Sequence, residues 1–249
     1  MSEDSEDKFT SGYFWMLYQD LERQFQDFLR FIPYLDGPNL TAYSFKLVNL
    51  ILSIGGHIDS CFKEMARYPD FAENEMCKRI LYKMEKSEHS LQSGKPPEPI
   101  SIRLCLEAFE GEYKLSKKYV VFKRIPVVEV VIPFGSWGSK EIPEWWKTYN
   151  DLKHDVSVNI EKATLRNARD ALAGAFLLNV VHIPSASRMF KYGLIEPNPE
   201  VAENVTKGTV FKFYITREEK LKEFYKKHKR FLGVVNTPLF AFAHEQGSE

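Results

Sequence analysis

The strongest constraint on the fold is a run of apolar residues that recurs every three or four positions between residues 43 and 65. An α-helix has about 3.6 residues per turn, so this spacing gathers the apolar side chains on one face. The pattern predicts an amphipathic helix that begins near residues 39–41, extends to about Arg67 and buries one face in a helical core. The stripe consists of Tyr43, Leu47, Leu50, Ile51, Ile54, Ile58, Phe62 and Met65.

The rest of the chain supplies more helices and a few strands. Helical spacing recurs at 13–35, 73–91 and 101–112, and a long helix is predicted from Asn159 to Val181. Runs rich in β-branched residues at 119–122 and 127–132 predict a β-hairpin. A strand at 209–215 and a helix at 217–232 follow. We therefore predict a mainly α fold: a helical bundle with a small β-hairpin insertion and a C-terminal β-strand plus helix.

These elements suggest three segments. Residues 1–12 form an acidic leader that we expect to be disordered, and residues 13–183 form the helical-bundle domain with its β insertion around 117–135. Residues 184–249 form a C-terminal α/β appendage that we expect to pack on the same domain.

Composition narrows the function classes. Lys plus Arg number 34 and Asp plus Glu number 34, so no net field attracts nucleic acid or an anionic membrane, and any anion site is local. The three cysteines, Cys61, Cys77 and Cys105, lie in apolar surroundings without zinc-ligand spacing, which predicts reduced, buried thiols. With neither a targeting segment nor a membrane span in the sequence, we expect a cytoplasmic protein with no membrane partner, metal or cofactor.

One flank of the helix predicted at 43–65 carries a row of small residues, namely Asn49, Ser53, Gly56 and Ser60. Glycine inside a helix costs about 1 kcal/mol relative to alanine unless packing offsets the loss. The row therefore predicts the close approach of another helix.

The densest group of chemically useful side chains lies at residues 145–155, just before the most apolar helix. On a helix, one stripe consists of Trp145, Tyr149, Leu152 and Val156, and another of Lys147, Asn150, Asp151 and His154. Asn150 and His154 are one turn apart, so both can contact one phosphate or water, with Lys147 or Lys153 adding charge. In the alternative interpretation, Asn150 and Asp151 solvate the helix and His154 bonds to a nearby loop.

Asp59 is a further candidate, because a bundle places the middle of its helix near the final helices, close to Lys153 or His154. A carboxylate there would raise the pKa of the imidazole. The alternative is a local Asp59–Lys63 pair one turn apart. His57 and His182 show no partner pattern and are interpreted as structural.

The order of these features resembles the HEPN superfamily of helical domains. The resemblance rests on the long amphipathic helix, the insertion, the run Trp-x-x-Tyr-Asn-Asp-Leu-Lys-His-Asp at 146–155 and an Ala-rich final helix, over residues 40–181. It implies a dimer and, in many members, a metal-free ribonuclease with an Arg-x4–6-His motif. His154 matches the motif's histidine, but Lys147, Thr148 and Tyr149 stand where the arginine is expected. A lysine does not reproduce the two-pronged grip of a guanidinium on phosphate.

Two functions follow. The first is a dimeric binding or interaction module, in which the aromatic surface and the small-residue helix face bury a second copy. The second is a metal-independent ribonuclease or phosphate-processing toxin or defence enzyme, with RNA or a nucleotide as partner. There, His154 acts as general acid or base, Asn150 orients the phosphate and Lys147 stabilises developing charge. Further candidate binding residues are Lys153, Asp155, Tyr149 and Asp59. A metal site at His154 and Asp155 is disfavoured, because adjacent helical residues point about 100° apart.

Overall fold

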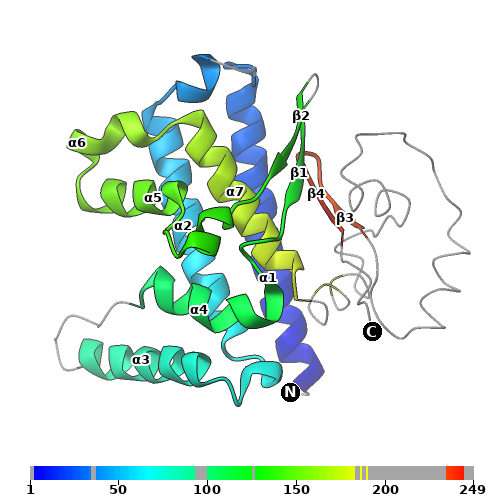
Figure 1. The fold of residues 1–249 in the computed structure, drawn as a ribbon, viewed down its shortest axis with the longest axis vertical. Coiled ribbons are helices and arrows are strands. Elements are labelled where there is room, and N and C mark those ends of the chain that lie inside the picture. The colour runs from blue at the N-terminus through cyan, green and yellow to red at the C-terminus, as the bar shows by residue number, and fades with distance from the viewer. Residues whose placement is uncertain are drawn as a thin grey trace, which may run out of the picture.

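The computed structural model describes residues 3–34, 38–92, 100–124, 127–182 and 234–243, together with residues 186 and 189. Within these residues the protein is mainly α, as predicted, with a small antiparallel sheet at one side (Figure 1). The helices are α1 (Glu3–Leu29), α2 (Phe45–Met65), α3 (Glu75–Gln92), α4 (Ile102–Tyr113), α5 (Glu144–His154), α6 (Val156–Asn159) and α7 (Leu165–Val180). Short 3-10 turns lie at η1 (Pro38–Thr41), η2 (Pro69–Phe71), η3 (Gly135–Ser139) and η4 (Ile160–Lys162). The predicted strand at 209–215 and helix at 217–232 lie outside the described residues.

Helix α2 is central to the bundle and contacts α1, α5 and α7. It begins after Ser44, whose hydroxyl accepts a hydrogen bond from the backbone N–H of Leu47 at 3.2 Å and so caps the helix. The predicted apolar stripe is buried from Leu47 to Met65. Tyr43 differs, because it lies before the cap and is half exposed. The periodicity therefore identified the helix correctly and placed its start slightly too early.

Helix α1 begins at Glu3, well before the start that its apolar spacing predicts, so the expected disordered leader at 1–12 overlaps its first turns. Apolar periodicity cannot reveal this extension, because the added residues are mostly polar.

The helix predicted from Asn159 begins later, at Leu165, and α6 and η4 precede it. Thr164 caps α7 by accepting from the N–H of Asn167 at 3.2 Å. The side-chain amide of Asn159 donates to the carbonyl oxygens of Asp151 (3.2 Å) and Asp155 (2.8 Å). Such side-chain bonds to the backbone compete with a continuous helix, which explains the break.

The sheet has the strand order β2-β1-β4-β3, with all neighbours antiparallel. Strands β1 (Val120–Arg124) and β2 (Val127–Val131) form the predicted hairpin. Strands β3 (Val234–Asn236) and β4 (Phe240–Ala243) were not predicted, and they join the end of the chain to β1. The C-terminal hairpin is held on α1 by the buried carboxylate of Glu22, which accepts from the Thr237 hydroxyl (2.5 Å) and the Leu239 N–H (2.9 Å).

A buried arginine links α7 to the first hairpin. The guanidinium of Arg169 donates to Asp170 (2.7 Å) and to Glu129 on β2 (2.5 Å), and it also contacts the Tyr34 hydroxyl. Tyr34 in turn donates to Glu129 at 2.9 Å. Because Arg169 is almost fully buried, these partners supply the hydrogen bonds that it loses with water.

The three cysteines are free and buried, as predicted. None of the helices in the described ranges is sufficiently long and apolar to cross a bilayer.

Candidate functional site

Helix α5 carries the Trp-rich segment, with most of the predicted apolar stripe buried and the polar stripe exposed or partly buried. Val156, which we predicted on the apolar stripe, lies beyond the end of α5 in α6 and is partly buried. Within α5 the apolar stripe is buried: Trp145, Tyr149 and Leu152 are inside, and the indole N–H of Trp145 donates to the Pro133 carbonyl at 2.6 Å. The exposed residues of the other stripe include Lys147 and His154. The core therefore fixes the orientation of α5, and the polar candidates face outward.

Tyr149 of α5 packs closely against Gly55 of α2. An alanine Cβ at Gly55 would lie 2.2 Å from the Cδ2 atom of Tyr149, so only glycine fits beneath the ring. Trp146 packs on the same ring, with centroids 4.9 Å apart. Burial raises the pKa of Tyr149, which keeps its hydroxyl protonated. Tyr149 is therefore part of the packing between helices, and the ammonium of Lys153 lies 5.8 Å from its ring centroid.

Two of the predicted polar residues make local interactions. Lys147 pairs with Glu144 one turn earlier at 3.3 Å. Asp155 caps α6 by accepting from the N–H groups of Ser157 (3.0 Å) and Val158 (3.3 Å). The Ser157 hydroxyl also donates to this carboxylate at 2.6 Å, and this bond, followed by the backbone N–H bonds, lowers the pKa of Asp155, so its carboxylate stays ionised. Each group would have to exchange an existing partner to contact a ligand.

His154 and Asn150 differ from these residues. His154 is exposed at the C-terminal end of α5, and Asn150 is partly buried one turn earlier. Neither side chain bonds to any other residue in the described part of the chain. The structure therefore leaves this imidazole accessible to solvent.

Asp59 forms the local pair considered as the alternative in the sequence. Its carboxylate lies 2.5 Å from the ammonium of Lys63 on the next turn of α2. After burial, the negative charge of Asp59 is the second cause of the raised pKa of Tyr149. Among the described interactions, none joins Asp59 to Lys153 or His154.

Three residues of the predicted small-residue row on α2 line a groove of about 450 Å³, whereas the fourth, Asn49, is not among the described lining residues. Its α2 wall contains Ser53, Gly56, His57 and Ser60. Its α1 wall contains Tyr13, Phe14, Leu17, Asp20, Leu21 and Gln24. A Cβ added at Gly56 would meet no atom within 4 Å, so no described residue makes the predicted close helix contact at Gly56. The close approach occurs instead at Gly55, on the adjacent face.

The groove has both apolar and uncharged polar side chains in its lining, and it opens to solvent. Asp20 is the only lining side chain with a formal charge, and it contacts Arg23 and accepts from Gln24 at 2.7 Å. The Gln24 hydrogen bond is the main reason that the pKa of Asp20 is lowered. Tyr13 and Leu17 are 52% and 38% exposed along its rim, with Met16 beside them at 65%. Contiguous apolar surface of this kind is typical of an interaction site.

A buried polar cluster lies between the groove and a second, smaller cavity. The side-chain amide of Asn179 donates to the Ala175 carbonyl (2.8 Å) and to Nε2 of His57 (2.9 Å), and Cys61 Sγ lies 3.4 Å from the same nitrogen. Because Nε2 accepts, the ring proton is on Nδ1, which has no partner among the described residues. No sequence pattern indicates this role of Asn179, because its side-chain partners His57 and Cys61 lie more than a hundred residues earlier.

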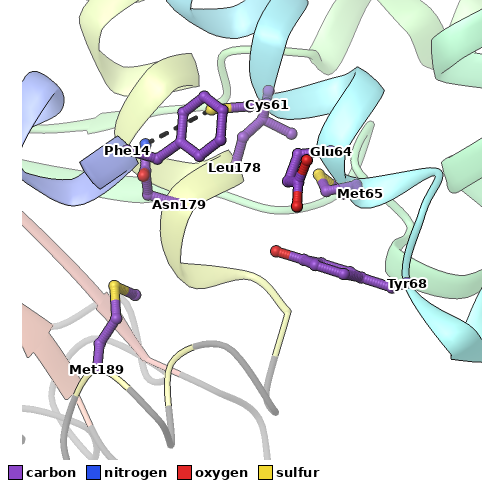
Figure 2. Close-up of a pocket in the computed structure, with 8 residues that line it drawn as sticks. All are labelled: Phe14, Cys61, Glu64, Met65, Tyr68, Leu178, Asn179 and Met189. Atoms are coloured by element: carbon purple, nitrogen blue, oxygen red, sulfur yellow. Dashed lines mark hydrogen bonds between the residues drawn. The ribbon is translucent and has the colours of Figure 1, made fainter. Parts of the chain in front are cut away.

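This cysteine, histidine and asparagine do not form an activated nucleophile. Burial raises the pKa of Cys61 and lowers that of His57 to about 4, so both groups are neutral near pH 7. The adjoining cavity, of about 20 Å³, has room for little more than one water molecule. Figure 2 shows Phe14, Cys61 and Asn179 near one another and Tyr68 apart from them, beside Glu64. Phe14 lines both cavities.

The lowered pKa of His57 predicts acid sensitivity. The unfolded chain binds this proton near pH 6.5 and the folded chain only near pH 4, so stability falls as the pH drops through that interval. We expect His57 to account for a loss of about 2 to 3 kcal/mol of unfolding free energy between pH 7 and pH 4. Urea unfolding at each pH measures it, and His57→Gln should remove that part of the pH dependence. An equal pH dependence in the variant would contradict the assignment.

The other buried histidine has a structural environment as well. Nε2 of His182 lies 3.1 Å from the Asp70 carboxylate, and its ring stacks on Tyr68 with centroids 4.1 Å apart. No three His, Cys, Asp or Glu side chains in the described ranges converge to hold a metal ion.

Comparison of the chain with family models, with curated proteins and with solved structures finds no match.

Proposed function

We propose that the protein is a dimeric helical binding module and that the groove between α1 and α2 binds an apolar helix of a partner protein. The observation that carries the proposal is the row of Ser53, Gly56 and Ser60 on α2, which lines an open groove beside the exposed apolar residues Tyr13 and Leu17 of α1. Small residues spaced three and four apart form a smooth strip along a helix, and they let a second helix approach closely. An apolar helix laid in such a groove is a common mode of recognition.

The charge of the groove defines the partner further. Asp20 is already paired within its own chain, and His57 is neutral. A charged partner side chain would lose its hydration in this groove without gaining an opposite charge. We therefore expect the bound face of the partner helix to carry aliphatic or aromatic residues and no formal charge.

The groove can be tested with two matched glycine substitutions. Gly56 and Gly111 are both exposed helical glycines with no atom within 4 Å of a built Cβ, but only Gly56 lies in the groove. We expect Gly56→Trp to fill the groove and weaken binding of the apolar dye anilinonaphthalene sulfonate by about tenfold or more, equivalent to about 1.4 kcal/mol. Gly111→Trp in α4 should bind the dye as the unmodified protein does. Equal dye affinity in both variants would argue against the groove as the apolar site.

A metal-independent ribonuclease or phosphate-processing enzyme is the second candidate. One observation favours it: the imidazole of His154 is exposed and makes no bond within the described chain, with Asn150 one turn away. Lys147 would supply charge to a bound phosphate only by leaving Glu144. If this function is correct, RNA incubated in EDTA is cut by the protein and is cut far more slowly by His154→Ala. Intact RNA in both reactions would remove the candidate.

A further inference from the structure

The outer edge of β2 presents backbone groups that no described strand satisfies. The N–H of Lys123 donates to the Leu239 carbonyl at 2.7 Å, so residue 123 of β1 points toward β4. Because backbone direction alternates along a strand, residues 120, 122 and 124 then bond to β2 at 131, 129 and 127. It follows that Val128 and Val130 direct their N–H and C=O groups away from β1, at the edge of the sheet formed by the described strands.

The sequence of β2 is symmetric about its centre, Val-Val-Glu-Val-Val. If two copies of this strand pair antiparallel across a two-fold axis at Glu129, Val128 of one copy lies opposite the partner's Val130. Both residues direct their backbone groups outward, so both can form the hydrogen-bonded pairs of an antiparallel ladder. The two copies of Glu129 then form the non-hydrogen-bonded pair between them. A one-residue shift of register would oppose an outward residue to an inward one and lose these bonds.

The side chains at this edge are compatible with such pairing. Val130 lies on one face of β2 and Ile132 directly follows the strand, and each is 49% exposed. Glu129 lies on the opposite face and pairs with Arg169 at 2.5 Å, so the two carboxylates near the axis are each neutralised within their own chain. Strand β2 has no lysine or proline, the residues that usually protect an edge from pairing.

We infer that β2 pairs with β2 of a second copy, so that the two four-stranded sheets become one continuous sheet across a two-fold axis. The inference rests on the proposed function, because it names the surface that holds the second copy. It leaves the groove between α1 and α2 free for the partner helix, since β2 contributes no residue to that groove.

Proline at position 130 tests the ladder. Val130→Pro removes an N–H that points away from β1, so it should leave the hairpin folded and abolish pairing between copies. Val130→Thr keeps both the N–H and the β-branched shape and is the matched control. The mass of each protein is measured by light scattering at about 50 μM, a concentration above the micromolar dissociation constants of modest interfaces. We expect the unmodified protein and Val130→Thr to have the mass of two chains. We expect Val130→Pro to have the mass of one chain. Circular dichroism and thermal unfolding show whether each variant is folded.

A charge-complementation experiment does not depend on proline. Val130→Glu and Val128→Lys each place a charge at the pairing edge, and each variant alone should be monomeric. Mixed together, they should form a heterodimer, because the new carboxylate of one chain faces the new ammonium of the other.

The outcomes separate the inference from the proposed function. A dimeric protein whose Val130→Pro variant is equally dimeric would overturn the β2 interface and leave the dimeric module standing. A protein that is still monomeric at about 200 μM would overturn both. Its dimer would then have a dissociation constant above about 200 μM, which corresponds to a binding free energy smaller than about 5 kcal/mol.

Discussion

Gly55→Ala is expected to lower the free energy of unfolding by about 3 kcal/mol, because the new methyl group overlaps a buried ring. Its Cβ would lie 2.2 Å from Cδ2 and 2.5 Å from Cε2 of Tyr149. That ring has little room to move, since Trp146 packs against it with centroids 4.9 Å apart. Urea unfolding measures the loss. In a Tyr149→Leu background the same substitution should cost much less, because the aromatic ring that it strikes is absent.

At the next residue, Gly56, we expect alanine to raise the free energy of unfolding instead of lowering it. Gly56→Ala adds a methyl group that meets no atom within 4 Å. Alanine restricts the unfolded chain more than glycine does, so we expect a gain of about 0.5 to 1 kcal/mol in unfolding free energy. A lower free energy of unfolding in Gly56→Ala would show that another part of the protein covers Gly56. An unchanged free energy of unfolding in Gly55→Ala would show that Tyr149 of α5 does not pack on Gly55 of α2.

The second large effect is expected at Arg169. Arg169→Met keeps much of the aliphatic length but removes the cation that Glu129 and Asp170 contact. Removing one partner of a buried ion pair costs about 3 to 5 kcal/mol, because the remaining charges lose their compensation. Burial already raises the pKa of Asp170 in spite of Arg169, so the loss should shrink as the pH falls and that carboxylate takes up a proton.

Arg169→Lys is the informative control for this network. A lysine keeps the charge but cannot serve Glu129, Tyr34 and Asp170 together in the planar geometry of a guanidinium. We expect a stability between those of Arg169→Met and the unmodified protein, measured by urea unfolding at pH 7. A loss below about 1 kcal/mol in Arg169→Met would mean that the cluster is a minor contributor.

Much of the bundle could be predicted because its information is local. The stripe from Leu47 to Met65, the short helix predicted at 101–112 and the hairpin at 120–131 depend on residues close together in sequence. The start of α7 was misplaced because the capping bond of Thr164 and the bonds of Asn159 interrupt a pattern that otherwise continues. Strands β3 and β4 were missed because they are short and are stabilised by distant partners, such as Glu22 on α1.

The candidate site was less predictable because it depends on contacts between residues that are far apart in sequence. The sequence shows that Tyr149 and His154 lie on different faces of α5, and the structure agrees. It does not show which small-residue face receives a neighbour: the structure packs Tyr149 on Gly55 and leaves Gly56 in an open groove. Two adjacent glycines have equal helical propensity, so only the tertiary contacts distinguish them.

If both proposals are correct, the protein has two separate interaction surfaces, the groove and the β2 edge. The α1 and α2 residues of the groove and the outward residues of β2 do not overlap. A dimer formed through β2 would therefore carry two copies of the groove and could bind two partner helices. Such bivalence increases the apparent affinity for a partner that is itself clustered.

The most direct test of the groove is chemical-shift mapping with an amphipathic helical peptide that carries leucine at every third or fourth position and no charge on that face. We predict that the peptide shifts the backbone amide resonances around Leu17, Ser53, Gly56 and Ser60, with little change around His154. The Gly56→Trp variant should lose these shifts. Shifts confined to other surfaces, or none at millimolar peptide, would contradict the proposal that this groove is a helix-binding site.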